Sequence, residues 1–222
     1  GLGTPLSNFE AGENYQEVDD PALTIAFELQ EEKGTYFLAW TTTPWTLISN
    51  LALMVGGETT YVKARQEGRE GLFILAEDRL FAYPHFEVVE RFKGSDLVGK
   101  SYLPLFPYFS HLEAFRVILG EEVSTSEGTG IVHAAPAFGE QDFYACRAAG
   151  IPLVCPVDQN GIFTAEIPEY HGKFVKSADK EIIKRLKSSG ALFEAATVHH
   201  RYPFCPRSDT PIIYRATSTW FV

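Results

Sequence analysis

The 222-residue chain lacks the features that mark several common classes of protein. It has no run of about 18 apolar residues, so the sequence predicts no membrane-spanning helix. It has only three cysteines, Cys146, Cys155 and Cys205, and no Cys-x-x-Cys pair. This pattern argues against a disulfide framework and against a zinc site built from this chain alone, and it favours a reducing compartment.

The beginning of the chain also lacks expected features. Gly1-Leu2-Gly3 contains no initiator methionine, no basic segment and no apolar segment, and the only methionine is Met54. The start therefore does not look like a signal peptide. We expect the chain to be a fragment or a processed product of a longer protein.

Positive charge is scarce. The formal net charge of −10 disfavours extended contact with nucleic acid, because affinity for phosphates depends largely on Lys and Arg. Any such contact should be local, small or shared with another part of a parent protein. The sequence also has no glycine-rich phosphate loop, no serine nucleophile elbow and no His-Glu-x-x-His motif.

Short runs rich in Val, Ile, Phe, Tyr and Thr, separated by Gly or Pro, predict many short strands. The expected strands are Leu23–Leu29, Thr35–Thr42, Thr59–Ala64, Gly71–Leu75, Phe86–Phe92, Phe115–Leu119, Gly130–Ala134, Leu153–Val157 and Leu192–His199. The polar segment Ser7–Pro21 is expected to be irregular. Many short strands with turn signals between them favour a barrel or a sandwich.

Two helices are expected beside the strands. One spans Ser177–Ser189, with Ser177 as its N-cap, an apolar face containing Ile182, Ile183 and Leu186, and Gly190 as its stop. The other runs from about Gly139 to Ala149 and stops at Gly150. The predicted class is α+β, mainly β, with a few peripheral helices.

The first segment able to carry chemistry is the tract Trp40-Thr41-Thr42-Thr43-Pro44-Trp45-Thr46. Strand alternation sends Thr41 and Thr43 to one side and Thr42 to the other, and Pro44 ends the ladder. The hydroxyls, with backbone N–H groups left free at the broken ladder, suit a water, a sugar hydroxyl or an oxyanion. The alternative is that threonine simply favours strands and that both tryptophans belong to the core.

The second segment runs from Gly128 to Asp142 and reads as turn, strand, loop and helix start. His133 is expected at the strand end and Asp142 in the first helical turn, where sites are commonly built. The alternatives are a satisfied, partly buried histidine and a carboxylate placed favourably at a helix N-terminus. A third segment contains His199, His200 and Cys205, but its spacing matches no common zinc pattern and a fourth ligand is missing.

Together these segments resemble the editing insertion of class I aminoacyl-tRNA synthetases, specifically of the isoleucyl type. The threonine tract with Leu47 and Asn50 is similar to the threonine-rich motif of that family, and residues 128–142 to its second editing motif. Pro5-Leu6-Ser7-Asn8-Phe9-Glu10 resembles the entry strand. Thr210–Thr217 with Trp220-Phe221-Val222 resembles the strand that returns to the synthetic domain.

Two positions favour the isoleucyl type within this family. Valyl and leucyl editing domains typically carry Arg where this chain has Thr43, and Lys or Met where it has His133. The His-Ile-Gly-His and Lys-Met-Ser-Lys-Ser signatures of aminoacylation are absent, so this chain is not expected to activate amino acids. Some members bind zinc through paired cysteines near the return strand. Here Ser208 follows Cys205-Pro206-Arg207, so no metal and no cofactor are expected.

The resemblance implies a single editing domain over residues 1–222 that hydrolyses valyl-tRNA(Ile), and valyl-adenylate as a further substrate, with water as the nucleophile. The implied catalytic residues are Thr41, Thr42, Thr43 and Asp142. The implied substrate-binding residues are Trp40, Thr41, Thr43, His133, Asp142 and Asn50. Asp142 would bind the substrate ammonium, His133 would exclude isoleucine and Asn50 would contact the terminal adenosine.

The expected partners are the acceptor end of tRNA(Ile) and the rest of a parent synthetase. We expect a cytoplasmic location, no membrane, and a monomer for the isolated domain. The general base stays open between His133 and the neighbouring ribose hydroxyl of the substrate. Two other interpretations stay open as well: an editing domain for a different amino acid, of the valyl or leucyl type, and a non-catalytic barrel that binds a ligand.

Overall fold

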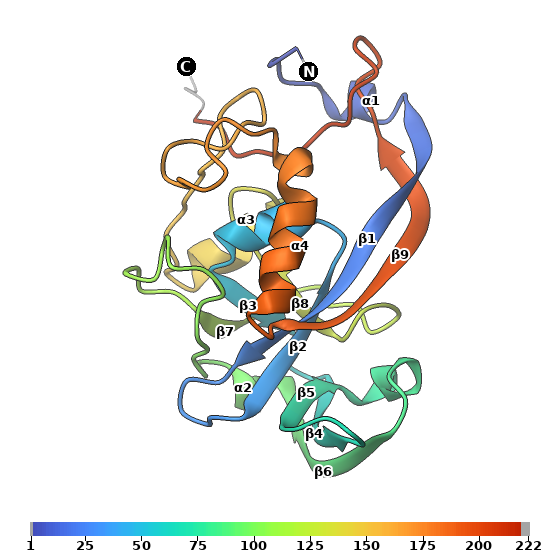
Figure 1. Ribbon diagram of the computed structural model, residues 1–222, viewed down its shortest axis with the longest axis vertical. Coiled ribbons are helices and arrows are strands. Elements are labelled where there is room, and N and C mark those ends of the chain that lie inside the picture. Colours follow the sequence, from blue (N-terminus) through green and yellow to red (C-terminus); the bar gives the residue numbers. More distant parts are fainter. Residues whose placement is uncertain (1, 219–222) are drawn as a thin grey trace.

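The structure, a computed structural model, describes residues 2–218 and consists mainly of one curled β-sheet with helices at its periphery (Figure 1). The path of the sheet is β6-β4-β5-β2-β8-β3-β7, and β1 pairs with both β2 and β9. The strands are β1 (Tyr15–Glu28), β2 (Thr35–Thr41), β3 (Ala52–Val55), β4 (Thr60–Gln66), β5 (Leu72–Ala76), β6 (Phe86–Lys93), β7 (Arg116–Leu119), β8 (Ile131–Ala134) and β9 (Leu192–Pro203).

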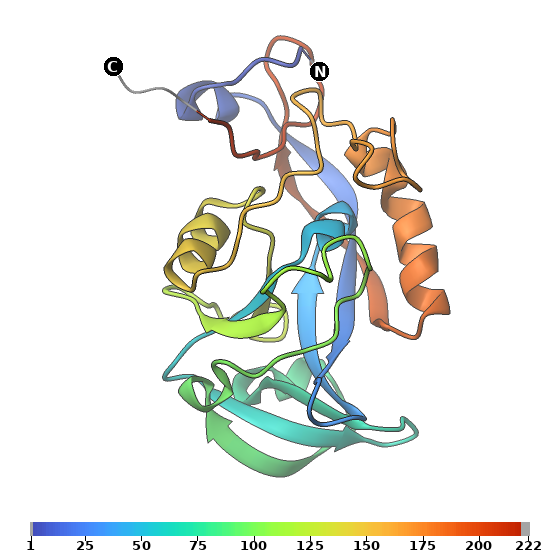
Figure 2. The same ribbon diagram turned by 90° about the vertical axis from the view of Figure 1, so that its left-hand side faces the viewer.

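The helices are short and lie around this sheet (Figure 2). The α-helices are α1 (Asn8–Ala11), α2 (Gly94–Leu97), α3 (Glu140–Ala148) and α4 (Asp179–Ser188). The 3-10 helices are η1 (Pro44–Ser49), η2 (Glu77–Ala82) and η3 (Val175–Ala178). The expected class, mainly β with a barrel-like sheet and peripheral helices, is confirmed. No helix within residues 2–218 has the length and the apolar character needed to cross a bilayer.

Strand β2 organises the sheet because its second edge is shared by two strands. One edge pairs antiparallel with β1. Along the other edge, Thr35–Phe37 pair with β5, and Trp40 pairs with Val132 of β8. Thr129 closes the split between β5 and β8: its Oγ1 donates to the Leu38 carbonyl at 2.6 Å, and its own carbonyl accepts the Ala76 N–H at 2.8 Å. The threonine tract and the strand of His133 are therefore joined to one another.

Side chains on the two faces of β2 enter different apolar clusters, as strand alternation requires. Phe37 and Ala39 belong to the main core, which extends under η1 and α4. Leu38 faces a smaller cluster formed with β4, β5 and Phe193. Helix α4 packs its apolar face, with Ile182 and Leu186 buried, beside η1. The loop after β2 is thus held between the sheet and a helix from the end of the chain.

Eight of the nine expected strands and both expected helices are found, seven of the strands within a few residues and Leu23–Leu29 as the second half of β1, but other expectations were wrong. Leu153–Val157 is not a strand: Pro152 and Pro156 have no N–H to donate to a ladder, and only Val157 forms an isolated bridge. The apolar run of β3 was not recognised as a strand. Ser177 is not an N-cap; it lies inside η3, and Ala178 precedes α4 without a side-chain cap.

The expectations for the N-terminal and C-terminal parts of the chain were also wrong. The segment Ser7–Pro21, expected to be irregular, contains α1 and half of β1, which pairs with β9 from Tyr15 onwards. The expected entry strand over residues 5–10 is not a strand: residues 8–10 belong to α1, which has a capping box between Ser7 and Glu10. Thr210–Thr217 forms no strand beyond a bridge at Pro211, and Trp220, Phe221 and Val222 lie outside the described residues.

Candidate active site

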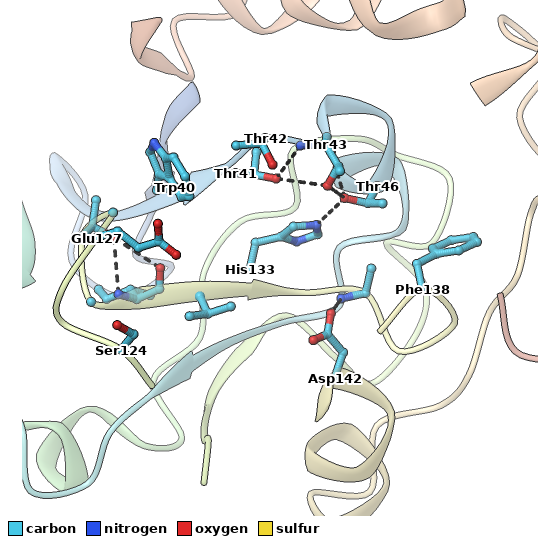
Figure 3. Close-up of a pocket in the computed structure, with 16 residues that line it drawn as sticks. Trp40, Thr41, Thr42, Thr43, Thr46, Ser124, Glu127, His133, Phe138 and Asp142 are labelled. Carbon is cyan, nitrogen blue, oxygen red and sulfur yellow. Dashed lines mark hydrogen bonds between the residues drawn. The ribbon is translucent and has the colours of Figure 1, made fainter. Parts of the chain in front are cut away.

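A cavity of about 290 Å³ lies between the end of β2, strand β8 and the start of α3 (Figure 3). Six of the seven side chains predicted from the sequence line it: Trp40, Thr41, Thr42, Thr43, His133 and Asp142 do so, whereas Asn50 does not. Ligand sites of proteins are typically concave, with a few converging polar groups. This cavity has that character, and its lining residues come from both of the segments singled out in the sequence.

The threonine tract reaches the cavity because β2 ends at Thr41 and the chain turns into η1. Thr41 Oγ1 accepts the Thr43 N–H at 3.1 Å and lies 3.3 Å from Thr43 Oγ1. These two side chains therefore share a side, as alternation predicted. The Thr42 hydroxyl is not part of this pair and also lines the cavity.

The expectation of free backbone N–H groups at the broken ladder was wrong for two of them. The Thr43 N–H is bound by Thr41, and the Trp45 N–H donates to the Asp179 carboxylate at 3.0 Å. Buried N–H groups are rarely left unpaired, and this loop follows that rule. The polar groups that the tract offers to the cavity are thus chiefly its hydroxyls.

Thr46, which the sequence did not single out as a site residue, links the tract to His133. Its Oγ1 donates to the Thr43 carbonyl at 2.8 Å, lies 2.9 Å from Thr43 Oγ1 and lies 3.0 Å from His133 Nε2. Thr46 stands one helical turn after Thr43, and this spacing was the signal that could have found it. The hydroxyls and the imidazole form one connected network.

Asn50 lies behind the histidine and fixes its tautomer. Its Nδ2 donates to the Ala52 carbonyl at 3.0 Å and contacts His133 Nδ1 at 2.9 Å, while its Oδ1 accepts the Tyr102 hydroxyl at 2.6 Å. Because a carbonyl only accepts, the amide nitrogen faces Ala52 and His133, so His133 Nδ1 is the acceptor. His133 Nε2 then carries the proton and donates to Thr46.

His133 is 8% exposed, and burial lowers its pKa to about 4. The imidazole is neutral at physiological pH, and both of its nitrogens are engaged within the protein. A ring in this state offers the cavity a rigid wall and no free lone pair. The alternative interpretation of His133 as a satisfied, buried histidine describes its hydrogen bonding, although the ring also lines the cavity.

Asp142 is the third residue of α3 and reaches the cavity from the side of β8 opposite the threonines (Figure 3). Its Oδ2 accepts the Ala135 N–H at 2.9 Å, which leaves Oδ1 for another partner. A Cβ at Gly139 would lie 2.9 Å from the carboxylate, so only glycine leaves room for it. Burial raises the pKa of Asp142 above its ordinary value, although the N–H groups of Ala135 and of Asp142 itself oppose the shift.

The remaining lining residues were not predicted. Phe138 lines the cavity and packs edge-on against Trp45, with ring centroids 4.9 Å apart. Ser124 and Glu127 are exposed and come from the loop before β8. A surface loop of this kind carries no periodic signal, so its approach to the cavity was not readable from the sequence. The cavity therefore has a hydroxyl-lined wall, a neutral imidazole wall and one inner carboxylate.

Comparisons with known proteins found relatives in sequence and in fold. No family model matches the chain. Over its whole length the chain is 59% identical to the isoleucine–tRNA ligase of Protochlamydia amoebophila, 54% to that of Bdellovibrio bacteriovorus and 53% to that of Chlamydia trachomatis serovar A. The chain spans 22% of the length of each of these relatives.

Solved structures show the same fold. The cytosolic leucyl-tRNA synthetase editing domain of P. falciparum superimposes with a TM-score of 0.61 at 11% identity, covering 78% of this chain and 98% of that one. The equivalent domain of P. knowlesi gives a TM-score of 0.58 at 11% identity, covering 78% and 95%. The resemblance noted from the sequence is confirmed: the chain is homologous to a segment of isoleucine–tRNA ligases and has the editing-domain fold.

Proposed function

We propose that this chain is one editing domain of a longer isoleucine–tRNA ligase and that it hydrolyses valyl-tRNA(Ile). One observation supports this most: a partly buried carboxylate, three threonine hydroxyls and a neutral histidine line the same cavity. A second pocket is needed because valine is one methylene smaller than isoleucine. The isoleucine–valine pair is the standard illustration of that limit, in which a missing methylene is worth only about 1–3 kcal/mol.

Asp142 would bind the α-ammonium of the amino acid through Oδ1. The Ala135 N–H fixes the carboxylate, and partial burial strengthens a charge-assisted bond to a cation. The arriving ammonium would compensate the burial that raises the pKa of Asp142, so the carboxylate would be ionised in the complex. This contact would hold the ester carbonyl in one orientation.

The hydroxyls of Thr41, Thr42 and Thr43 would orient the attacking water and stabilise the oxyanion. Hydroxyls fixed in advance by their own hydrogen bonds need little rearrangement during the reaction. The Thr41–Thr43 and Thr43–Thr46 contacts supply that fixation for Thr41 and Thr43. Because an aminoacyl ester is already activated, water can serve as the nucleophile without a covalent enzyme intermediate.

His133 would act as the wall that excludes isoleucine and not as the general base. Its proton-free nitrogen, Nδ1, is engaged by Asn50 behind the ring, and its pKa of about 4 makes it a weak base. Of the two candidates for the base, the neighbouring ribose hydroxyl of the substrate is therefore the better supported. Asn50 would act through His133 and not by contact with the adenosine.

The partners follow from this function. We propose the acceptor end of tRNA(Ile) and valyl-adenylate as ligands, with the adenosine towards Trp40 and the mouth of the cavity. A net charge of −10 fits a small contact with a single-stranded end, while other parts of a parent synthetase hold the tRNA. We further propose a cytoplasmic location and a monomer for the isolated domain.

The test is a deacylation panel with valyl-tRNA(Ile), isoleucyl-tRNA(Ile) and threonyl-tRNA(Val). We expect hydrolysis of the first and sparing of the second. Preference for threonyl-tRNA(Val) would assign the domain to a different amino acid. Titration with a non-hydrolysable valyl-adenosine analogue covers the non-catalytic alternative: chemical-shift changes at Thr41–Thr43 and Asp142 support the proposal, and no detectable binding contradicts it.

A further inference from the structure

Helix α4 contributes a side chain to the loop that carries the threonines. Asp179, the first residue of α4, accepts the Trp45 N–H on its Oδ1 at 3.0 Å, across 134 positions of sequence. Trp45 is the second residue of η1, directly after the threonine tract. The contact therefore joins a distant helix to the turn on which the cavity hydroxyls are mounted.

This hydrogen bond replaces a cap that η1 does not provide for itself. The first N–H groups of a helix have no partner inside the helix, and an N-cap threonine commonly supplies one with its own hydroxyl. Thr43 is the N-cap of η1 but makes no side-chain cap, and Pro44 has no N–H. Asp179 accepts the N–H that remains.

Capping from outside has a consequence for Thr43. Its hydroxyl contacts Thr46 Oγ1 at 2.9 Å and Thr41 Oγ1 at 3.3 Å, and it lines the cavity. A hydroxyl turned back to cap its own helix could not make these contacts in the same way. The external cap leaves the Thr43 hydroxyl available to the cavity.

We propose that Asp179 is a positioning residue for this site: by capping η1 from α4, it fixes the threonine tract and leaves the Thr43 hydroxyl in the network that lines the cavity. The catalytic part of this inference rests on the proposed function, whereas the capping does not. Asp179 itself does not line the cavity and touches no reacting atom.

The surroundings of Asp179 explain why an oxygen acceptor matters more here than a negative charge. Burial raises its pKa to about 7; Lys176 opposes the shift and Asp20 adds to it. Asp20 in turn contacts His200 at 2.7 Å, and the Lys176 ammonium lies over the Tyr202 ring at 3.8 Å. The carboxyl group is thus near its midpoint at neutral pH, and an amide oxygen in its place should accept the same N–H.

The experiment compares Asp179→Ala and Asp179→Asn with the wild-type chain. Glu181→Gln is the matched control, because Glu181 is an exposed carboxylate on the same helix. The first readout is hydrogen exchange at the Trp45 amide, which requires no assumption about function. The second is kcat and KM for deacylation of valyl-tRNA(Ile).

In Asp179→Ala, we expect Trp45 exchange to rise about tenfold, the effect of losing one helix cap. We expect kcat to fall by a similar factor with KM nearly unchanged. Asp179→Asn should restore both values to within about threefold of the wild type, since the amide keeps the acceptor oxygen. Glu181→Gln should match the wild type in both readouts.

Two results would overturn the inference. One is an unchanged rate of hydrogen exchange at the Trp45 amide in Asp179→Ala. The other is an Asp179→Asn variant that folds but has the same exchange rate and the same kcat as Asp179→Ala. Absence of deacylation in the wild-type chain would count against the proposed function instead, and the exchange data would still decide whether Asp179 caps η1.

Discussion

Two aspartates at the beginnings of two helices show how similar local chemistry serves different ends. Asp142 stands in the first turn of α3 and Asp179 in the first turn of α4. Each accepts one backbone N–H from another segment, at 2.9 Å from Ala135 and at 3.0 Å from Trp45. Burial raises the pKa of both carboxyl groups. They are alike in the direction of the pKa shift and in their place within the first helical turn.

They differ in what faces the second carboxylate oxygen. Asp142 lines the cavity, opposite the threonines, whereas Asp179 lies behind the threonine loop and does not line it. A perturbed pKa in a cleft marks a candidate functional group only as a probability, because structural contacts perturb pKa values too. Access to the cavity is what separates a residue suited to bind a cation from one suited to position a loop.

The largest effect that separates the two residues is expected from their asparagine variants. Asp142→Asn should lower kcat/KM for valyl-tRNA(Ile) by about 100-fold, because the substrate ammonium loses its charge-assisted partner. Asp179→Asn should remain near the wild type. Deacylation assays on both variants test this, with Glu140→Gln, an exposed carboxylate in the same turn as Asp142, as the control. Equal losses at positions 142 and 179 would contradict the different roles proposed for the two residues.

A smaller effect is expected at His133, the side chain that connects the two regions. Its Nε2 contacts Thr46 of the loop capped by Asp179, and its ring lines the cavity that contains Asp142. His133→Ala should widen the cavity and raise isoleucyl-tRNA(Ile) hydrolysis relative to valyl-tRNA(Ile) by about tenfold, a typical value for one methylene. The ratio of the two kcat/KM values is the measurement. An unchanged ratio would remove His133 as the wall against isoleucine.

The two aspartates also differ in how well their roles could be predicted from the sequence alone. Asp142, His133 and the threonines were predicted to form a site, because each lies next to glycine, proline or a strand end within a recognisable motif. Asp179 was only an early acidic residue of a predicted helix. Its partner Trp45 is 134 positions away, and no local pattern reports such a contact.

The same limit explains the errors in the fold. Strands with alternating or β-branched residues, such as β2 and β4, were found from their pattern. Strand β3 has four buried residues and no alternation, so its pairing with both β7 and β8 was not readable. The first half of β1 is mostly polar and contains no buried residue, and it is a strand only because β9 pairs with it along its length. Local sequence patterns located the segments that form the site, whereas pairing between distant segments determined the strands that hold them in place.

The smallest effect is on stability, and here the two aspartates should behave alike. A carboxyl group whose pKa is raised by folding stabilises the fold fully below its unfolded pKa of about 3.9, and this contribution is lost as pH rises through the folded pKa. For Asp179 that window ends near pH 7, and burial shifts the pKa of Asp142 in the same direction. Each asparagine variant should therefore be more stable than the wild type at pH 8 and should lose this advantage at pH 4. For Asp179→Asn we expect a gain on the order of 1 kcal/mol, or about 2–4 °C in Tm. Thermal unfolding at both pH values measures it.

The combination of stability and activity separates the two roles. If Asp142→Asn is more stable but less active, the Asp142 carboxylate is needed to bind the substrate. If Asp179→Asn is more stable and keeps its activity, Asp179 is needed for its acceptor oxygen and not for its charge.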